Sequence, residues 1–362
     1  MFRNVSGNQN FLTRLLRVVA VTGELQNQRI KMTTLRYPLV CAALLTATLQ
    51  LRAQHYPAGI AGIKAGTLPT PGFTAEDDNS FYYFNHFSGF GGQLNDMKGF
   101  DYVQTPRLTW MTHLDFLDTD IGAGIRVPFA YKQVTANSGR SLGTGIFPPP
   151  PGTPATKSTK RLFGLADIEV QPLLLAWRWQ HFDLSTGYSF WAPTGDYDKN
   201  RLFPENIGQG YWTHSFMLGV TWYPDAARTW AVSILNHFDI NMEQYSSLVT
   251  TTVSPAHPLG ITSIGTTLGD INTLEWAVSK SIRNFDLGVT GYYQQQVTAT
   301  QGPMFNGPTY GNEWIHVAGI GPEIQYAYAP WGLSASLRYA YEFTAMDHTQ
   351  GHLINLTFSK SF

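Results

Sequence analysis

Two carboxylates, Asp167 and Glu169, are the first residues of this chain whose types and spacing could do chemistry. They stand two positions apart, a spacing that places both side chains on one face of a β-strand. Paired carboxylates can carry out acid–base chemistry or bind a cation. The alternative is a structural ion pair with an arginine, and we favour this alternative, with Arg126 or Arg107 as the partner.

A second pair, His237 and Asp239, has the same spacing. A His–Asp pair on a strand can orient a nucleophile, as in a hydrolase. The candidate serine lies in Gly187-Tyr-Ser-Phe-Trp191, which lacks the second glycine of a nucleophile elbow. We therefore assign no catalytic residue and keep a hydrolase as the least favoured function.

The wider set of candidate residues would line a polar path through the interior. Basic members would come mainly from the first strands and the eleventh, and acids mainly from the middle, so that a transverse field could orient solutes. The alternative is a network of ion pairs that fills the interior, because buried charges must be paired or hydrated. The set is Arg107, Arg126, Asp167, Glu169, His237, Asp239, Glu275, Glu323, Arg338 and Glu342.

Strands must position these side chains, because apolar and polar residues alternate along most of the chain. In one segment Trp230, Val232, Ile234, Phe238 and Ile240 share one face, and Ser233, His237 and Asp239 lie on the other. About twelve such segments follow residue 80, each near the ~10 residues that a tilted strand needs to cross a bilayer. Their centres are Phe84, Trp110, Ile125, Val170, Gly187, Leu218, Leu235, Trp276, Val289, Ile320, Leu337 and Leu356.

The composition favours a surface that faces lipid. Of the 362 residues, 14% are charged and 14% are aromatic, whereas about 25% are charged in a typical soluble domain. A net charge of −1 argues against a nucleic-acid partner. Outside the N-terminus no apolar run is long enough for a helical span, so only a closed barrel could cross lipid.

The predicted connections alternate in length, as they do in outer-membrane barrels. Long connections cover 134–162, 195–209, 244–266 and 300–312, and short ones lie near 117–118, 177–180, 224–227, 282–284 and 329–331. An even number of strands places both termini on the side of the short turns, the periplasm. Loop aromatics such as Phe147, Tyr211 and Tyr310 could catch apolar solutes or anchor the interface.

The C-terminal strand alternates through Ile354, Leu356, Phe358, Lys360 and Phe362. A terminal aromatic of this kind resembles the signal that the outer-membrane assembly machinery recognises, so Phe362 is the predicted assembly signal. Lys360 departs from the usual pattern, which has an aromatic two residues before the end. A lysine at the rim of the barrel can extend its charge to the headgroups.

The N-terminus divides into three segments by composition. Residues 1–31 look like an upstream extension before the true start at Met32, and residues 32–53 have the layout of a signal peptide. The only cysteine, Cys41, lies in that signal peptide. Residues 54–79 are rich in glycine and proline, yet too apolar for a solvated linker, so they are a periplasmic tail or a plug of the barrel, which begins at residue 80.

Three stretches carry a family resemblance. They are Phe163-Gly-Leu-Ala-Asp-Ile-Glu-Val-Gln-Pro172, Ala192-Pro-Thr-Gly-Asp-Tyr-Asp198 with the following Asn206-Ile-Gly-Gln-Gly-Tyr-Trp212, and the tail around Ala65–Gly72. Together they resemble the outer-membrane transporter family of the phenol meta-degradation pathway. The resemblance covers about residues 57 to 362 and implies a barrel in the outer membrane. Its most specific motif is Pro193, Thr194, Gly195, Asp196 and Tyr197.

We therefore predict an all-β, antiparallel, up-and-down transmembrane barrel that acts as a passive channel for small, hydrophobic or aromatic compounds. A structural or adhesion barrel with a closed lumen is the alternative. The expected partners are outer-membrane lipid, the barrel-assembly machinery and the solutes, without nucleic acid. No cofactor or metal is predicted, since the oxygen ligands at Asp196, Asp198 and Glu205 fit no known calcium loop.

Overall fold

The computed structural model describes residues 55–89, 92–94, 97–114, 118–138, 156–198, 206–250, 260–301 and 314–362, and all statements below refer to these residues. The predictions for the extension 1–31, the signal peptide 32–53, Phe147, Glu205 and Tyr310 lie outside them. Among the described residues, no helix combines the length and apolar character needed to cross a bilayer.

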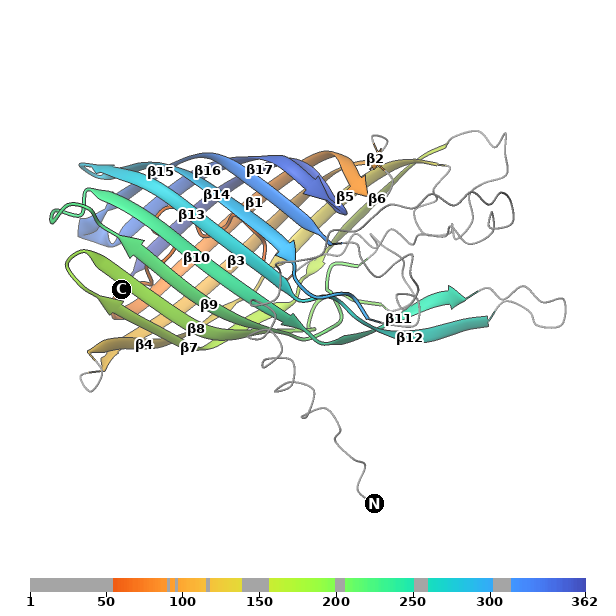
Figure 1. Ribbon diagram of the computed structural model, residues 1–362, viewed down its shortest axis with the longest axis horizontal. Coiled ribbons are helices and arrows are strands. Elements are labelled where there is room, and N and C mark those ends of the chain that lie inside the picture. The colour runs from red at the N-terminus through yellow and green to blue at the C-terminus, as the bar shows by residue number, and fades with distance from the viewer. Residues whose placement is uncertain are drawn as a thin grey trace, which may run out of the picture. The chain divides into compact units, whose positions relative to one another are not determined.

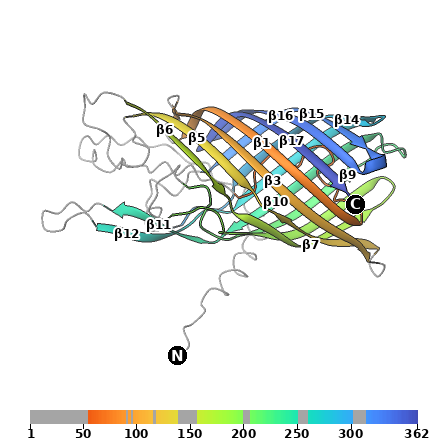
Figure 2. The same cartoon turned by 180° about the vertical axis from the view of Figure 1, so that it is seen from behind.

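The described residues form a closed antiparallel β-barrel of 12 strands, which Figures 1 and 2 show from opposite sides. Closure follows from the first strand, which pairs with both β3 and β17. The strands of the barrel are β1 (Gly72–Gly89), β3 (Met97–Leu114), β4 (Thr119–Arg126) continued by β5 (Phe129–Ser138), β6 (Thr156–Leu165) continued by β7 (Ile168–Arg178), β8 (Phe182–Ala192), β9 (Thr213–Trp222), β10 (Trp230–Asn241), β13 (Ile271–Ile282), β14 (Phe285–Gln296), β15 (His316–Tyr328), β16 (Leu333–Met346) and β17 (His348–Ser361).

Three small elements extend this barrel. β2 (Gly92–Leu94) pairs with the end of β1, and a 3₁₀ turn, η2 (Ala329–Trp331), connects β15 to β16. β11 (Glu243–Thr250) and β12 (Gly260–Thr267) form a separate two-stranded sheet. The C-terminus lies at the end of the barrel with the short connections, as predicted.

Along the strands, apolar side chains point out of the barrel and small polar side chains point into it, as the sequence predicts. Leu218 and Ile234 point outward, with 55% and 49% of their surfaces exposed, whereas Ser215 and Ser233 are each 1% exposed inside. Large aromatics gather on the outer surface near the short turns, which is the girdle expected at one membrane interface. They include Trp179, Phe182, Trp222, Trp230, Phe285 and Trp331.

The predicted start of the barrel at residue 80 is wrong, because β1 begins at Gly72. The polar run from Glu76 to Asn79 lacks the apolar alternation of a membrane strand. It is nevertheless paired on both sides, with β3 and with β17. On the outer face, the Gln104 side chain donates hydrogen bonds to Asp77 at 3.1 and 3.2 Å. These polar groups thus satisfy one another within the sheet.

Two further predictions need correction. Most of the predicted long loop 244–266 is the hairpin β11–β12. Ile240 continues the period-two series of Trp230, Val232 and Ile234, which predicts it outside, but it is 3% exposed. Both deviations occur where β10 ends and the chain leaves the barrel. Period-two alternation indicates lipid only along the segment that crosses it, so it assigns faces incorrectly beyond the bilayer.

Candidate functional site: a plugged lumen

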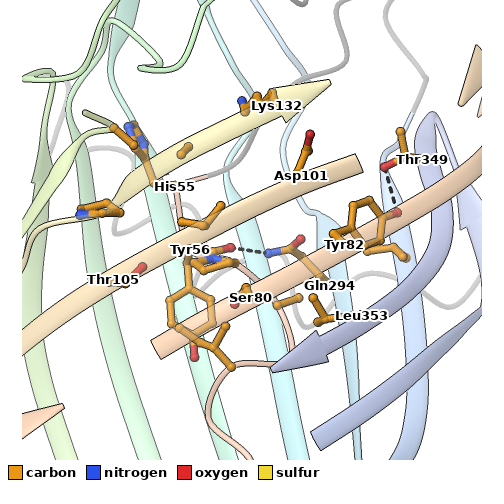
Figure 3. A pocket seen from close by; sticks show the side chains of 18 of the residues that line it. His55, Tyr56, Ser80, Tyr82, Asp101, Thr105, Lys132, Gln294, Thr349 and Leu353 are labelled. Atoms are coloured by element: carbon orange, nitrogen blue, oxygen red, sulfur yellow. Dashed lines mark hydrogen bonds between the residues drawn. The ribbon is translucent and has the colours of Figure 1, made fainter. Parts of the chain in front are cut away.

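Residues 55–71 fill part of the barrel interior. Tyr56 is 1% exposed, and Ile63 and Leu68 are also buried. Figure 3 shows His55 and Tyr56 among side chains from the barrel wall. A barrel of this strand number encloses more space than its own side chains fill. The apolar residues that made this segment a poor solvated linker are therefore buried by the barrel.

Two inward carboxylates hold the middle of this segment. Glu275 on β13 accepts hydrogen bonds from the Tyr56 hydroxyl at 2.6 Å and from the Ala61 amide at 2.9 Å. Glu323 on β15 accepts one from the Ile63 amide at 2.9 Å. Wall carboxylates thus satisfy backbone amides of a segment that has no secondary structure of its own.

Arg338 on β16 completes this attachment. Its guanidinium makes two hydrogen bonds to Glu323, at 2.8 and 3.2 Å, and donates a third to the Gly59 carbonyl at 2.5 Å. Gly62 lies directly against this guanidinium with a φ of 70°, and a Cβ at this position would overlap it. The glycine is thus required both for its backbone conformation and for close approach.

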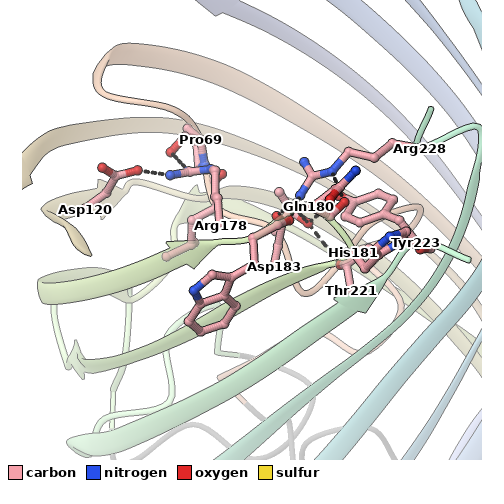
Figure 4. Close-up of polar contacts among 12 residues, drawn as sticks. Pro69, Asp120, Arg178, Gln180, His181, Asp183, Thr221, Tyr223 and Arg228 are labelled. Atoms are coloured by element: carbon pink, nitrogen blue, oxygen red, sulfur yellow. Dashed lines mark hydrogen bonds and ion pairs between the residues drawn. The ribbon is translucent and has the colours of Figure 1, made fainter. Parts of the chain in front are cut away.

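Asp183 holds the segment through Thr67, and Figure 4 shows this aspartate beside Tyr223 and Arg228. It accepts hydrogen bonds from the Thr67 hydroxyl at 3.0 Å, the Tyr223 hydroxyl at 2.7 Å and Arg228 at 2.5 Å. Burial raises the pKa of the Tyr223 phenol to about 12, so the phenol keeps its proton at physiological pH. In the same turn, hydrogen bonds led by the Trp230 amide lower the pKa of Asp225 to about 2.

Arg178 on β7 holds the point where the segment leaves the lumen. It donates to the backbone carbonyls of Leu68 at 2.8 Å and Pro69 at 2.6 Å, and it forms an ion pair with Asp120. A paired arginine that binds two successive carbonyls fixes the path of the chain just before β1 begins.

Asp167 joins the family motifs to the plugging segment. Its carboxylate accepts hydrogen bonds from the backbone amides of Gly195 at 2.9 Å and Gln209 at 2.6 Å, and it contacts His55 Nε2 at 2.9 Å. Gly195 packs directly on Gly208, whose Cα would lie 2.7 Å from a Cβ at position 195. The motif glycine therefore serves close packing between two loop segments.

The rest of the motif belongs to the same junction. The Thr194 hydroxyl accepts a hydrogen bond from the Ile168 amide at 3.0 Å. The Asp196 amide donates to the Leu165 carbonyl at 2.9 Å, and the Asp196 carbonyl accepts from Ile207 and from the following amide at 3.0 Å. No group of three or more metal-binding side chains is found within the described ranges.

All three predicted arginines form ion pairs with a carboxylate of a neighbouring strand. Arg126 pairs with Glu169 at 3.0 Å, and Arg107 pairs with Glu76 at 3.2 Å. The prediction of an arginine partner is confirmed for Glu169, but the partner of Asp167 is His55. Because each of these charges is compensated by its neighbour, the observed arrangement is that of an ion-pair network.

His237 and Asp239 both point inward, as predicted. The Tyr56 ring stacks on His237 with centroids 3.9 Å apart, and His237 Nδ1 lies 3.5 Å from Ser215 Oγ. Ser215 is also the register partner of Asp239 on the neighbouring strand. The plugging segment thus covers the imidazole that a hydrolase would need to expose.

A cavity of about 300 Å³ remains between the plugging segment and the wall formed by β1, β3 and β5. Glu342, another predicted residue, lies at its edge and accepts hydrogen bonds from the hydroxyls of Tyr82 at 2.6 Å and Tyr292 at 2.8 Å. Apolar and aromatic side chains make up much of the lining (Figure 3), among them Tyr56, Tyr82, Phe84, Val103, Trp191, Tyr292, Val317 and Leu353.

The sequence prediction omitted the aromatic members of this site. Tyr82 and Trp191 lie on the inward face of their strands, and alternation could have identified both. His55 and Tyr56 offered no comparable signal, because they precede the first strand. Their partners Asp167 and Glu275 lie 112 and 219 residues away in the sequence.

Comparison with solved structures gives the same fold. The COG4313 outer membrane channel from Pseudomonas putida F1 matches with a TM-score of 0.60 at 12% identity, covering 85% of this chain and 100% of that chain. The Pseudomonas putida toluene transporter TodX (TM-score 0.39, 10% identity, 81% and 90% coverage) and the β domain of the Bordetella autotransporter BrkA (0.43, 11%, 80% and 99%) match more weakly.

A search among curated proteins found no match for this chain. A family of proteins does match, over residues 85–358, which include the Asp167 junction and most of the barrel. Its description is "Putative MetA-pathway of phenol degradation", and this chain belongs to that family.

Proposed function

We propose that this protein is a passive channel of the bacterial outer membrane for small hydrophobic or aromatic compounds. The observation that carries the proposal is the cavity of about 300 Å³ beside the plugging segment, lined largely by aromatic and aliphatic side chains. This volume is at the lower limit of typical small-molecule sites. It suits a single aromatic ring better than a sugar or a peptide.

Polar contacts hold the plugging segment, and such contacts can be exchanged for water. Its attachments include hydrogen bonds to Glu275, Glu323, Asp183 and Asp167, together with those from Arg338 and Arg178. If the segment shifts, water in the lumen can replace the hydrogen bonds that each of these groups loses. The predicted polar residues would then act as the seat of a movable plug that limits passage to small solutes.

Uptake by liposomes tests the channel directly. Vesicles that contain the purified protein are expected to take up benzyl alcohol faster than protein-free vesicles, with little gain for arabinose. Uptake of the two solutes is compared in the same vesicles, so leakage would appear for both. If uptake of neither solute exceeds that of protein-free vesicles, the lumen is closed and the alternative of a structural or adhesion barrel is correct.

We also propose that the protein is not an enzyme. The His237 imidazole is covered by Tyr56, and its distance of 3.5 Å to Ser215 is long for activation of a nucleophile. Hydrolysis of lipid, ester or peptide substrates by the purified barrel, abolished in His237→Gln, would contradict this proposal.

The barrel-assembly machinery is the proposed partner during insertion. Phe362 is 76% exposed, so its ring adds little to the folded barrel. Deleting Phe362 should therefore slow assembly without changing the stability of the assembled protein. Assembly is followed by gel electrophoresis of unheated samples, in which the folded barrel runs as a separate, heat-modifiable band. Phe362→Tyr keeps an aromatic ring and serves as the control. Normal assembly kinetics after the deletion would show that this signal is not used.

A further inference from the structure

Two buried N–H groups at the cavity lack an acceptor among the described residues. Trp191 on β8 and Arg126 on β4 both line the cavity, and they are only 4% and 7% exposed. Trp191 Nε1 and Arg126 Nε have no hydrogen-bond partner within the described part of the chain. Buried donors are almost always paired in native proteins, because an unpaired one loses its hydrogen bond to water.

The sheet register places both donors at one level of the lumen. Arg126 lies opposite Glu169, and Glu169 lies opposite Trp191, so the three side chains form one row across neighbouring strands. With a strand spacing of about 4.8 Å, the two donors originate roughly 10 Å apart. Both residues line the cavity, so a ligand bound there contacts the same row of side chains.

The charges around the cavity favour a neutral ligand. The charge of Arg126 is already compensated by Glu169, at 3.0 Å. The lining also contains Asp78, Asp101 and Glu342, and its lysine, Lys132, lies opposite Asp101 in the sheet. A carboxylate in this cavity would face these acids, while the arginine and the lysine of the lining each already stand opposite an acid. A neutral oxygen, in contrast, accepts a hydrogen bond without bringing a charge.

We propose that the cavity recognises neutral aromatic compounds that carry an oxygen acceptor, a hydroxyl or a carbonyl, through Trp191 Nε1 and Arg126 Nε. This inference rests on the proposed channel function and specifies its substrate class. The ring would lie against the aromatic lining, and the oxygen would satisfy the unpaired donors. Asp101 Oδ1, which also lacks a partner among the described residues, offers an acceptor to a hydroxyl proton.

A comparison of phenol with toluene isolates the contribution of the oxygen to binding. The two molecules have nearly the same shape, and toluene has a methyl group in place of the hydroxyl. Binding to the purified barrel is measured by saturation-transfer NMR and competition. Phenol is expected to bind about 5–10-fold more tightly than toluene, as one or two net hydrogen bonds imply. Trp191→Phe should remove most of this difference by lowering the affinity for phenol and leaving that for toluene unchanged. The control Trp222→Phe, on the outer surface, should change neither affinity.

Arg126→Lys provides a second variant, because it keeps a cation beside Glu169 while removing Nε. It too should weaken phenol selectively, and the heat-modifiable band verifies that each variant is folded. Equal binding of phenol and toluene, or tighter binding of benzoate than of phenol, would overturn the inference. If both neutral solutes also enter vesicles, the channel function stands. If neither solute binds or enters vesicles, the channel function itself fails.

Discussion

Deletion of residues 54–70 is expected to raise single-channel conductance several-fold and to leave the barrel folded. The segment lies inside the lumen, where Tyr56, Ile63 and Leu68 are buried, so its removal opens the cross-section it fills. The barrel wall keeps all of its strand pairing, because β1 begins only at Gly72. The freed carboxylates, such as Glu275 and Glu323, would become hydrated rather than buried and unpaired.

The measurement is conductance in planar bilayers, with residues 1–53 retained so that the predicted signal peptide is kept. Conductance equal to that of the full chain would place the segment outside the conducting path. A single substitution tests the attachment of the same segment to the barrel wall. Gly62→Val would overlap Arg338 and should displace the segment, raising conductance, whereas Thr70→Val, at an exposed position, should not.

The strands could be predicted because lipid outside and polar groups inside impose a strict alternation. This holds for β9 and for β10 up to Asp239, where every second residue is buried or half-buried inside the barrel. It fails at residues 72–79, where Asp77 on the outer face is satisfied by Gln104 of the next strand. A single-strand pattern cannot show that a polar side chain has found such a partner across the sheet.

The site could be predicted only in part, for a related reason. The alternation along each strand identified Glu275, Glu323 and Arg338 as residues that face the interior. Their partners, however, belong to a segment without periodicity. The motif around Gly195 was visible as a pattern, while its purpose depends on contact with Gly208 and Asp167. Contacts between irregular segments distant in sequence leave no period by which to recognise them.

Adjacent residues on β16 offer the sharpest test of the two faces. Leu337 is 49% exposed on the outside, whereas Ser336 faces the lumen and is half-buried. Leu337→Arg should destabilise the barrel by about 2–4 kcal/mol if the residue lies near the midplane, because the guanidinium must face hydrocarbon. Ser336→Arg should cost much less, since its charge can reach hydrated groups in the lumen.

Unfolding of both variants in lipid vesicles, followed by tryptophan fluorescence in guanidinium, measures the difference. Leu218→Arg and Ile234→Arg extend the outward set to β9 and β10. The inward serines Ser215 and Ser233 are unsuitable as mild controls, because they are fully buried and an arginine there would overpack the lumen. Equal destabilisation by Leu337→Arg and Ser336→Arg would mean that the register is shifted by one residue, since such a shift exchanges the two faces.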